Sequence, residues 1–312
     1  MRTKVKLRIA LLLVVSVSTI SLRAGAQDLE PRRWTPLPPG TNVVGGGVAV
    51  TQGDVLFDPA LQVEDAEVEA ETLGISYVHA FRLGSKLARF DITVPWQHAR
   101  YTGLLQGEPA TTARSGLMDP TFRLSMILAG AKPDPGVKSN TVVGAALAVI
   151  APMGEYMEDR LINLGQNRWV FRPQVGFVHT RGRWSYELTA SAFFFTDNDE
   201  FYGDSTREQD PLFAVQGHLI YAMSKPGYWL SLSAGYGGNG QSIIDGNRSD
   251  DDQRQFLSAL SYGMPLGRKQ GLKFAYVRSR TNTSKGSDTD TLAIAWALIF
   301  GPTQQTEELH VY

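Results

Sequence analysis

The feature that most constrains the fold is a two-residue alternation, which is clearest in TLAIAWALIF at residues 291–300. Successive side chains of an extended strand point to opposite faces, so alternate positions of this stretch form two separate faces. One face carries only large apolar side chains: Leu292, Ile294, Trp296, Leu298 and Phe300. Either protein or lipid must cover this face, and features elsewhere in the chain distinguish the two.

The same alternation recurs in twelve segments separated by turns, and each segment is a predicted strand. The segments lie near residues 41–52, 69–82, 86–100, 117–129, 140–151, 168–179, 183–196, 211–223, 227–238, 254–265, 271–280 and 290–300. Most of them are eleven to fifteen residues long. Strands of soluble proteins usually have about five or six residues, whereas a tilted membrane-spanning strand needs about 9–11. The strand lengths therefore favour a membrane barrel over a soluble β-sandwich.

The connections between the segments alternate in length. Tight connections lie at 83–85, 181–183, 225–227 and 266–270. Longer, mostly polar connections lie at 53–68, 101–116, 152–167, 197–210, 239–253 and 281–289, and the connection at 130–139 is longer than the pattern requires. Aromatic residues gather near segment ends: Trp34, Tyr77, Phe81, Trp96, Tyr101, Trp169, Trp184, Tyr202, Tyr221, Tyr228, Trp229, Tyr262 and Trp296. Short turns on one side, long loops on the other and aromatic girdles are typical of outer-membrane barrels.

We therefore predict an all-β fold, a transmembrane antiparallel β-barrel of about twelve strands over residues 41–300. Lipid then covers the face that includes Ile294, and both chain ends lie on the periplasmic, short-turn side. Residues 301–312 follow Phe300 as a C-terminal tail and leave open which residue ends the insertion signal of the barrel.

The N-terminus predicts export. MRTKVKLR carries four cationic side chains, IALLLVVSVSTI follows as a short apolar stretch, and Ala24-Gly25-Ala26 has the small-residue pattern of a cleavage site. The apolar stretch is shorter than the roughly 20 residues of a spanning helix. We expect a signal peptide at residues 1–26, cleaved near Ala26, and a mature protein in the outer membrane of a Gram-negative cell. The chain has no cysteine, so no disulfide stabilises it.

Several stretches carry a family resemblance. They are PRRWTPLPPGTNVV (31–44), VLFDPALQVEDAE (55–67), DRLINLGQNRWVFRPQVGF (159–177), FFFTDNDEFYG (193–203), REQDPLFAVQGHLIY (207–221) and DGNRSDDDQR (245–254). Together they resemble the family of outer-membrane transporters named for the MetA pathway of phenol degradation, over nearly all of the mature chain. The resemblance implies a porin-like transport role and brings no catalytic residues and no defined substrate.

Nine residues lie on the polar faces of the predicted strands and are candidates to line the lumen: Arg89, Asp91, Arg123, Arg172, Gln174, Glu187, Gln216, His218 and Lys273. Consecutive strands of such barrels pair antiparallel, so we expect Asp91 to meet Arg123 and Arg172 to meet Glu187 where the register allows. A twelve-stranded barrel is narrower than the 16–18-stranded porins, so long charged side chains can nearly fill it. These residues are therefore either structural filling or selectivity elements.

Residues 27–40 form a proline-rich lead-in before the first strand. Proline lacks the backbone donor of a central strand, so this segment cannot join the sheet. It carries Arg32, Arg33 and Trp34, which a lumen lined by Asp91 and Glu187 could accept. We expect the lead-in to fold into or across the periplasmic mouth, in competition with the alternative of a disordered tail.

Other motifs argue against enzymatic and cofactor chemistry. The glycines of GYGGNG (235–240) precede a polar loop, whereas a dinucleotide site needs a helix there. No H-E-x-x-H pairs the histidines, and the acidic clusters at 197–204 and 250–252 lack a calcium-loop spacing. We expect neither a cofactor nor a metal. An outer-membrane hydrolase remains an alternative, although no Ser/His pair can be chosen from spacing.

The predicted function is passive passage of small apolar or aromatic compounds through an outer-membrane channel. The alternative from another class is a closed structural barrel without transport. The expected partners are outer-membrane lipid, the barrel-assembly machinery and an unidentified small molecule. A formal net charge of −1 gives no reason to expect nucleic acid.

Overall fold

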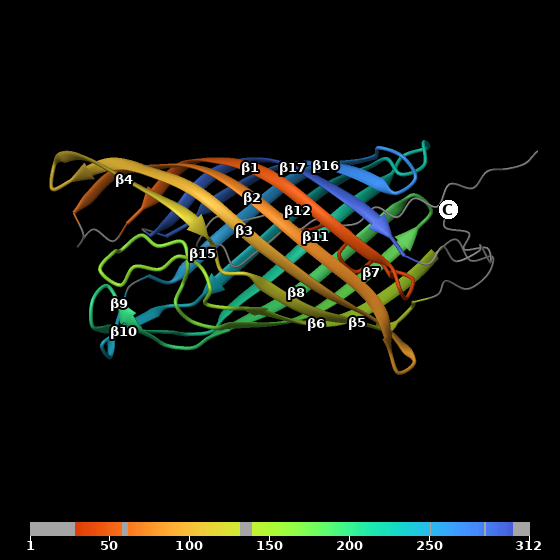
Figure 1. Cartoon of the computed structure of the whole chain (residues 1–312), viewed down its shortest axis with the longest axis horizontal. Helices are drawn as coiled ribbons and strands as arrows, with labels where there is room; N and C mark the ends of the chain where they lie inside the picture. Colours follow the sequence, from red (N-terminus) through yellow and green to blue (C-terminus); the bar gives the residue numbers. More distant parts are fainter. Residues whose placement is uncertain (1–28, 58–61, 132–138, 250, 284, 302–312) are drawn as a thin grey trace, which may run out of the picture.

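The computed structural model describes residues 29–57, 62–131, 139–249, 251–283 and 285–301. These residues form a closed barrel of long, strongly tilted strands (Figure 1). The predicted signal peptide and nearly all of the C-terminal tail lie outside the described residues. In the described part of the chain, no helix is long and apolar enough to cross a membrane.

Twelve antiparallel strands make the barrel wall. The first six are β1 (Asn42–Leu56), β2 (Val63–Leu83), β3 (Lys86–Leu105), β5 (Thr121–Ala129), β6 (Ser139–Ile150) and β7 (Val170–Arg181). The second six are β8 (Trp184–Phe195), β11 (Leu212–Ala222), β12 (Trp229–Asn239), β15 (Gln253–Pro265), β16 (Gln270–Thr281) and β17 (Gly286–Phe300). The first strand pairs with the last, and β2 pairs with both β1 and β3, so the sheet has no free edge within the wall. The predicted twelve-stranded barrel is confirmed.

Five further strands lie in segments that the sequence predicted to be loops. β4 (Glu108–Leu117) pairs with the far end of β3. The connections after β8 and β12 contribute a separate four-stranded sheet of β9 (Asn198–Phe201), β10 (Ser205–Gln209), β13 (Ser242–Ile244) and β14 (Asn247–Arg248). β1, β2 and β17 also extend into their predicted loops. Beyond the lipid the outward face is polar, so the alternation that revealed the other strands is lost there.

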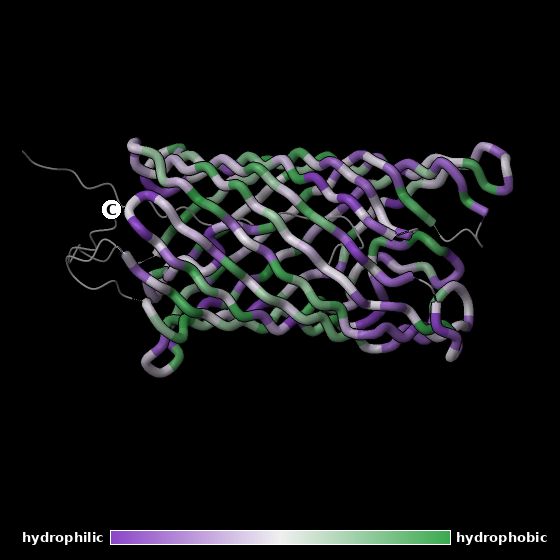
Figure 2. The backbone as a smooth tube through the Cα atoms, turned by 180° about the vertical axis from the view of Figure 1, so that it is seen from behind, coloured by the Kyte–Doolittle hydropathy of each residue, from purple (hydrophilic) through white to green (hydrophobic). Residues whose placement is uncertain are grey.

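The facing assignment of the last strand is confirmed. Leu292 is 66 % and Ile294 46 % exposed on the outer face, whereas Ala295 and Ala297 are buried inside. Hydrophobic positions recur along the strands, while the end with the long loops is largely hydrophilic (Figure 2). The large apolar side chains exposed on the strands include Leu232, Leu260 and Leu292. This distribution fits a barrel whose middle lies in lipid and whose long loops lie in water.

Two residues of the predicted aromatic girdle are placed elsewhere. Trp34 and Trp229 are 2 % and 1 % exposed and point into the barrel. Trp229 fits inside because its strand neighbour is Gly263, where an added Cβ would lie 2.0 Å from the indole Nε1. Other predicted girdle residues, such as Trp96, Trp169 and Trp184, are exposed on the outer surface.

Candidate functional site: the lumen and the segment inside it

All nine predicted lumen-facing side chains lie on the inner face of the barrel wall. They are between 3 % and 8 % exposed, and they comprise Arg89, Asp91, Arg123, Arg172, Gln174, Glu187, Gln216, His218 and Lys273. The period-two rule thus located the inner face of six strands correctly. Burial of so many polar groups requires that they be solvated by one another or by a polar filling.

The two predicted cross-strand ion pairs have different outcomes. Asp91 and Arg123 do lie directly opposite each other on β3 and β5. The carboxylate of Asp91 accepts hydrogen bonds from Arg89, on its own strand, at 2.9 and 3.1 Å. This pair stabilises one wall of the lumen.

The predicted pair of Arg172 and Glu187 is wrong. The register places Glu187 opposite Val178, six residues along β7 from Arg172. The Arg172 guanidinium lies 5.3 Å from the centroid of the Phe193 ring instead. Alternation fixes which face a residue occupies but leaves register shifts of two residues undetermined.

Residues 29–40 of the lead-in lie inside the barrel. Leu29, Trp34 and Leu37 are all buried, and the strands that they contact surround the lumen: β15 for Leu29, β5, β6 and β7 for Trp34, and β1, β2 and β17 for Leu37. A short segment can contact strands on opposite sides of the wall only if it occupies the interior. We call residues 29–40 the inner segment.

The indole of Trp34 fits a slot in the wall made by two glycines. An added Cβ at Gly176 of β7 would lie 1.9 Å from the indole Cε2, and one at Gly144 of β6 would lie 2.4 Å from Cε3. These glycines are opposite each other in the sheet. The indole Nε1 donates a buried hydrogen bond to Thr189 Oγ1 at 2.8 Å, so the polar edge of the ring is satisfied as well.

Charged groups hold the part of the inner segment that precedes Trp34. The backbone N–H of Arg32 donates to Glu187 Oε2 at 2.7 Å, and its guanidinium lies 5.8 Å from the centroid of the Trp229 ring. Arg33 forms an ion pair with Glu30 within the segment, and both side chains are buried. Glu187, predicted as a lumen residue, is therefore a binding partner of the inner segment.

The inner segment joins the wall at the short-turn end. Gly40 N–H donates to the Ala80 carbonyl at 2.7 Å, and Ala80 N–H donates to the Thr41 carbonyl at 2.9 Å. Ala80 lies near the end of β2, three residues before that strand's tight turn. The segment thus enters the lumen from the side at which β1 begins.

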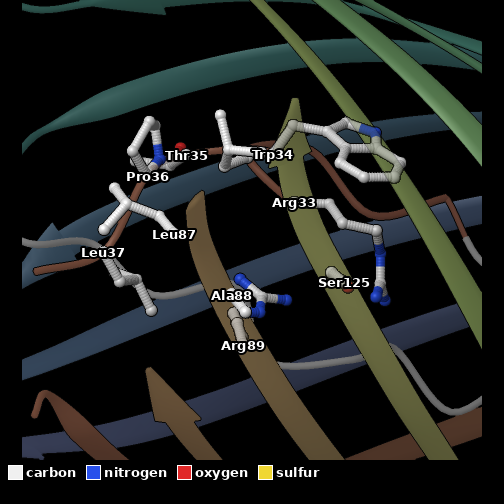
Figure 3. A pocket seen from close by; sticks show the side chains of 10 residues that line it. Arg33, Trp34, Thr35, Pro36, Leu37, Leu87, Ala88, Arg89 and Ser125 are labelled. Carbon is white, nitrogen blue, oxygen red and sulfur yellow. The ribbon is translucent and has the colours of Figure 1, made fainter. Parts of the chain in front are cut away.

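A small pocket remains between the inner segment and the wall (Figure 3). Its lining includes Arg33, Trp34 and Leu37 from the segment, Arg89 from β3 and Ser125 from β5. Arg33 extends alongside Ser125, and the Arg89 side chain points into the same space. The cavity volume is about 20 Å³, which is enough for a water molecule but not for an organic solute.

Two arginines that the sequence reasoning did not single out lie at the long-loop end. Arg168, 4 % exposed, donates a hydrogen bond to Gln209 Oε1 and lies 4.5 Å from the centroid of the Phe195 ring. Arg207 donates two hydrogen bonds to Ser242 Oγ, at 3.2 and 2.9 Å. Arg168 begins a predicted strand, and Arg207 lies in β10, where the sequence predicted a loop.

The electrostatics of Arg168 reflect these surroundings. Burial and the nearby Arg207 guanidinium lower its pKa to about 9, against the raising effect of Asp197, Tyr156 and Asp119. Arg168 is thus charged at neutral pH. Asp119 itself fixes the connection that precedes β7, because its carboxylate accepts from Gly154 N–H at 2.9 Å and Gln166 N–H at 2.7 Å.

The described structure gives little support for the alternative function of an outer-membrane hydrolase. His218 Nδ1 lies 2.8 Å from Ser233 Oγ, but His218 Nε2 is buried without a hydrogen-bond partner in the described structure. A nucleophilic serine needs a histidine that a third group orients. The glycines of residues 235–240 close strand β12 and lead into strand β13 rather than a helix. Within the described ranges, no cluster of three or more His, Cys, Asp or Glu residues could hold a metal ion.

Comparison with solved structures identifies the same architecture in an experimentally determined protein. The chain is similar to the COG4313 outer membrane channel from Pseudomonas putida F1, with a TM-score of 0.73 and 22% sequence identity over 86% of this chain and 99% of that chain. It is more distantly similar to the translocator domain of the autotransporter NalP from Neisseria meningitidis, with a TM-score of 0.45 and 8% identity over 86% of this chain and 91% of that one. No curated protein matches the chain.

A family model assigns the chain on sequence. The model described as "Putative MetA-pathway of phenol degradation" matches residues 41–288, which include eleven of the twelve wall strands in full and the beginning of β17. This match covers most of the chain and agrees with the resemblance seen in its individual stretches. The chain therefore belongs to the MetA-pathway phenol-degradation family.

Proposed function

We propose that the protein is an outer-membrane channel for small apolar or aromatic compounds and that the inner segment closes its periplasmic half. The observation that carries the proposal is a closed barrel with a polar interior in which a separate, non-strand segment occupies the lumen. Membership of a family described by phenol degradation, and likeness to a protein titled an outer membrane channel, support this reading.

The manner in which the lumen is filled favours a channel over a permanently closed structural barrel. A structural barrel can fill its lumen with side chains of its own strands. Here much of the filling comes from residues 29–40, which rejoin the wall at β2 and are held inside by contacts such as Trp34 to Thr189 rather than by strand pairing. A segment that is not part of the strand ladder can leave without breaking the pairing of the wall.

Flux measurements distinguish these two functions. The purified full-length protein is inserted in planar bilayers, and ionic current is recorded in potassium chloride and in potassium benzoate. A channel gives discrete current steps in both salts. A closed structural barrel gives the same baseline as protein-free lipid even when residues 27–38 are deleted, although it still migrates faster on a detergent gel before boiling than after.

We also propose that residues 1–26 are removed on export and that the barrel-assembly machinery inserts the mature chain into outer-membrane lipid. The small residues Ala24 to Ala26 and the closed barrel fold support this route. N-terminal sequencing of protein extracted from membranes should begin at Gln27. A start at Met1 would show that the leader is retained.

A further inference from the structure

The lumen carries an excess of positive charge that the chain as a whole does not have. The buried cationic side chains of the described residues are Arg33, Arg89, Arg123, Arg168, Arg172 and Lys273, and the buried anionic ones are Glu30, Asp91, Asp119 and Glu187. Six cations thus face four anions inside a chain whose formal net charge is −1. Low-dielectric walls increase the electrostatic potential that this excess charge produces in the lumen. A positive potential raises the local concentration of anions.

Two of these cations lie close together on one wall. Arg123 of β5 and Arg172 of β7 are both register partners of Ala148, which lies between them on β6. Two strand spacings, about 10 Å, therefore separate their backbones. Ala148 is 0 % exposed although its side chain is a single methyl group, so larger neighbours cover it. The two arginines form a pair of positive side chains across this wall.

Arg168 and Arg207 continue this wall toward the long-loop end. Arg168 precedes Arg172 by four residues and shares its inward face, and Arg207 is near enough to Arg168 to lower its pKa. The hydrogen-bond acceptors described for them, Gln209 Oε1 and Ser242 Oγ, are neutral. The carboxylates near them are Asp119 and Asp197 for Arg168 and Asp251 for Arg207. Arg168 Nη1 is buried and has no hydrogen-bond partner in the described residues. A buried guanidinium N–H without an acceptor is a site where an anion gains stabilisation.

Aromatic rings accompany these arginines. Phe195, Phe193 and Phe201 lie with their ring centroids 4.5, 5.3 and 5.3 Å from the guanidinium carbons of Arg168, Arg172 and Arg207, respectively. Guanidinium groups bind carboxylates through paired N–H donors and also stack on aromatic faces. A wall of alternating guanidinium and phenyl groups therefore matches a solute that has one carboxylate and one aromatic ring.

We propose that Arg123, Arg168, Arg172 and Arg207 form an anion-selective entrance that favours small aromatic carboxylates over cations. This inference rests on the proposed channel function and names the substrate class of that channel. The solute meets Arg168 and Arg207 first, at the extracellular mouth, and then Arg172 and Arg123 above the inner segment. The excess positive charge excludes cations from the same path.

Reversal potentials test the selectivity. The full-length protein is recorded in a potassium chloride gradient, and then with potassium chloride on one side and potassium benzoate on the other. We expect anion selectivity, with benzoate carrying current. The variants R168Q and R172Q should each shift the reversal potential toward zero and reduce the benzoate permeability relative to chloride. R172K keeps the charge and should preserve anion selectivity in potassium chloride.

The matched control is R160Q, which removes one positive charge from an exposed side chain of the same β6–β7 connection. It should leave the reversal potential unchanged. A cation-selective channel, or equal shifts in R160Q and R172Q, would overturn the entrance proposal while leaving the channel function intact. If neither the full-length protein nor a variant lacking residues 27–38 conducts, the channel function itself fails. Heat-modifiable migration of each variant establishes that the barrel has folded.

Discussion

At the scale of single residues, the closure of the lumen depends on two positions that have no side chain. Gly144 and Gly176 leave the slot that the Trp34 indole occupies, and Thr189 provides the acceptor for its N–H. From the sequence these glycines would be unremarkable strand positions, because their role appears only when Trp34 is placed against them. Trp34 itself could be predicted to enter the lumen, since a lead-in with a ring and two arginines suits a polar barrel.

The variant G176A tests this slot. Overpacking a fitted site costs about 1–3 kcal/mol, and we expect the indole to leave the slot rather than the strand to distort. Single-channel conductance should therefore rise above that of the wild type. G217A is the control, because an added Cβ there meets only Glu187 O, at 3.7 Å. Equal conductance of G176A and the wild type would mean that the indole does not close the path.

Arg168 gives the channel a predicted pH dependence. Its pKa is lowered to about 9, so it is positive below that pH and neutral above it. Loss of this charge should weaken anion selectivity as the pH rises through about 9. Reversal potentials measured from pH 7 to pH 10 check the prediction. The variant R168Q lacks the titrating group and should show a smaller change over the same range, whereas identical profiles would contradict the assignment.

At the scale of strands, the alternation predicted every wall strand but not their full lengths. In the part of β2 that was predicted to be a loop, residues 63–68, the exposed side chains are Glu64, Asp65 and Glu67. A stretch so rich in exposed carboxylates looks like a polar loop in the sequence. The pairing of β9, β10, β13 and β14 was invisible for the same reason and because those strands are only two to five residues long. The contact of Arg172 with Phe193 required a register, which alternation does not contain.

The outer face of β17 is tested by I294R. A cation on the lipid face near mid-membrane costs about 2–4 kcal/mol, and Ile294 lies in the middle of its pairing with β1, opposite Val48. We expect a lower urea midpoint in lipid vesicles. A295S is the control on the inner face, next to Leu37 and Val43, and should cost much less. Similar losses for both variants would contradict the facing assignment.

At the scale of the whole molecule, a narrow barrel is divided into two halves. The inner segment fills the periplasmic half and leaves a cavity of about 20 Å³ beside it, while the arginine wall lies toward the extracellular half. Strand count and facing could be predicted from the sequence because each depends on a local pattern. The place of Arg207 near the arginines of the wall could not, because Arg207 lies in β10, where the sequence predicted a loop.

The role proposed for the inner segment is tested by the conductance of a variant that lacks residues 27–38 but keeps residues 1–26. The wall pairs strand to strand without these residues, so the barrel should still fold and remain heat-modifiable. Removal of Trp34, Leu37 and the Glu30–Arg33 pair opens the periplasmic half. We predict single-channel conductance larger than that of the full-length protein. Unchanged conductance in a correctly folded variant would contradict the claim that this segment closes the channel.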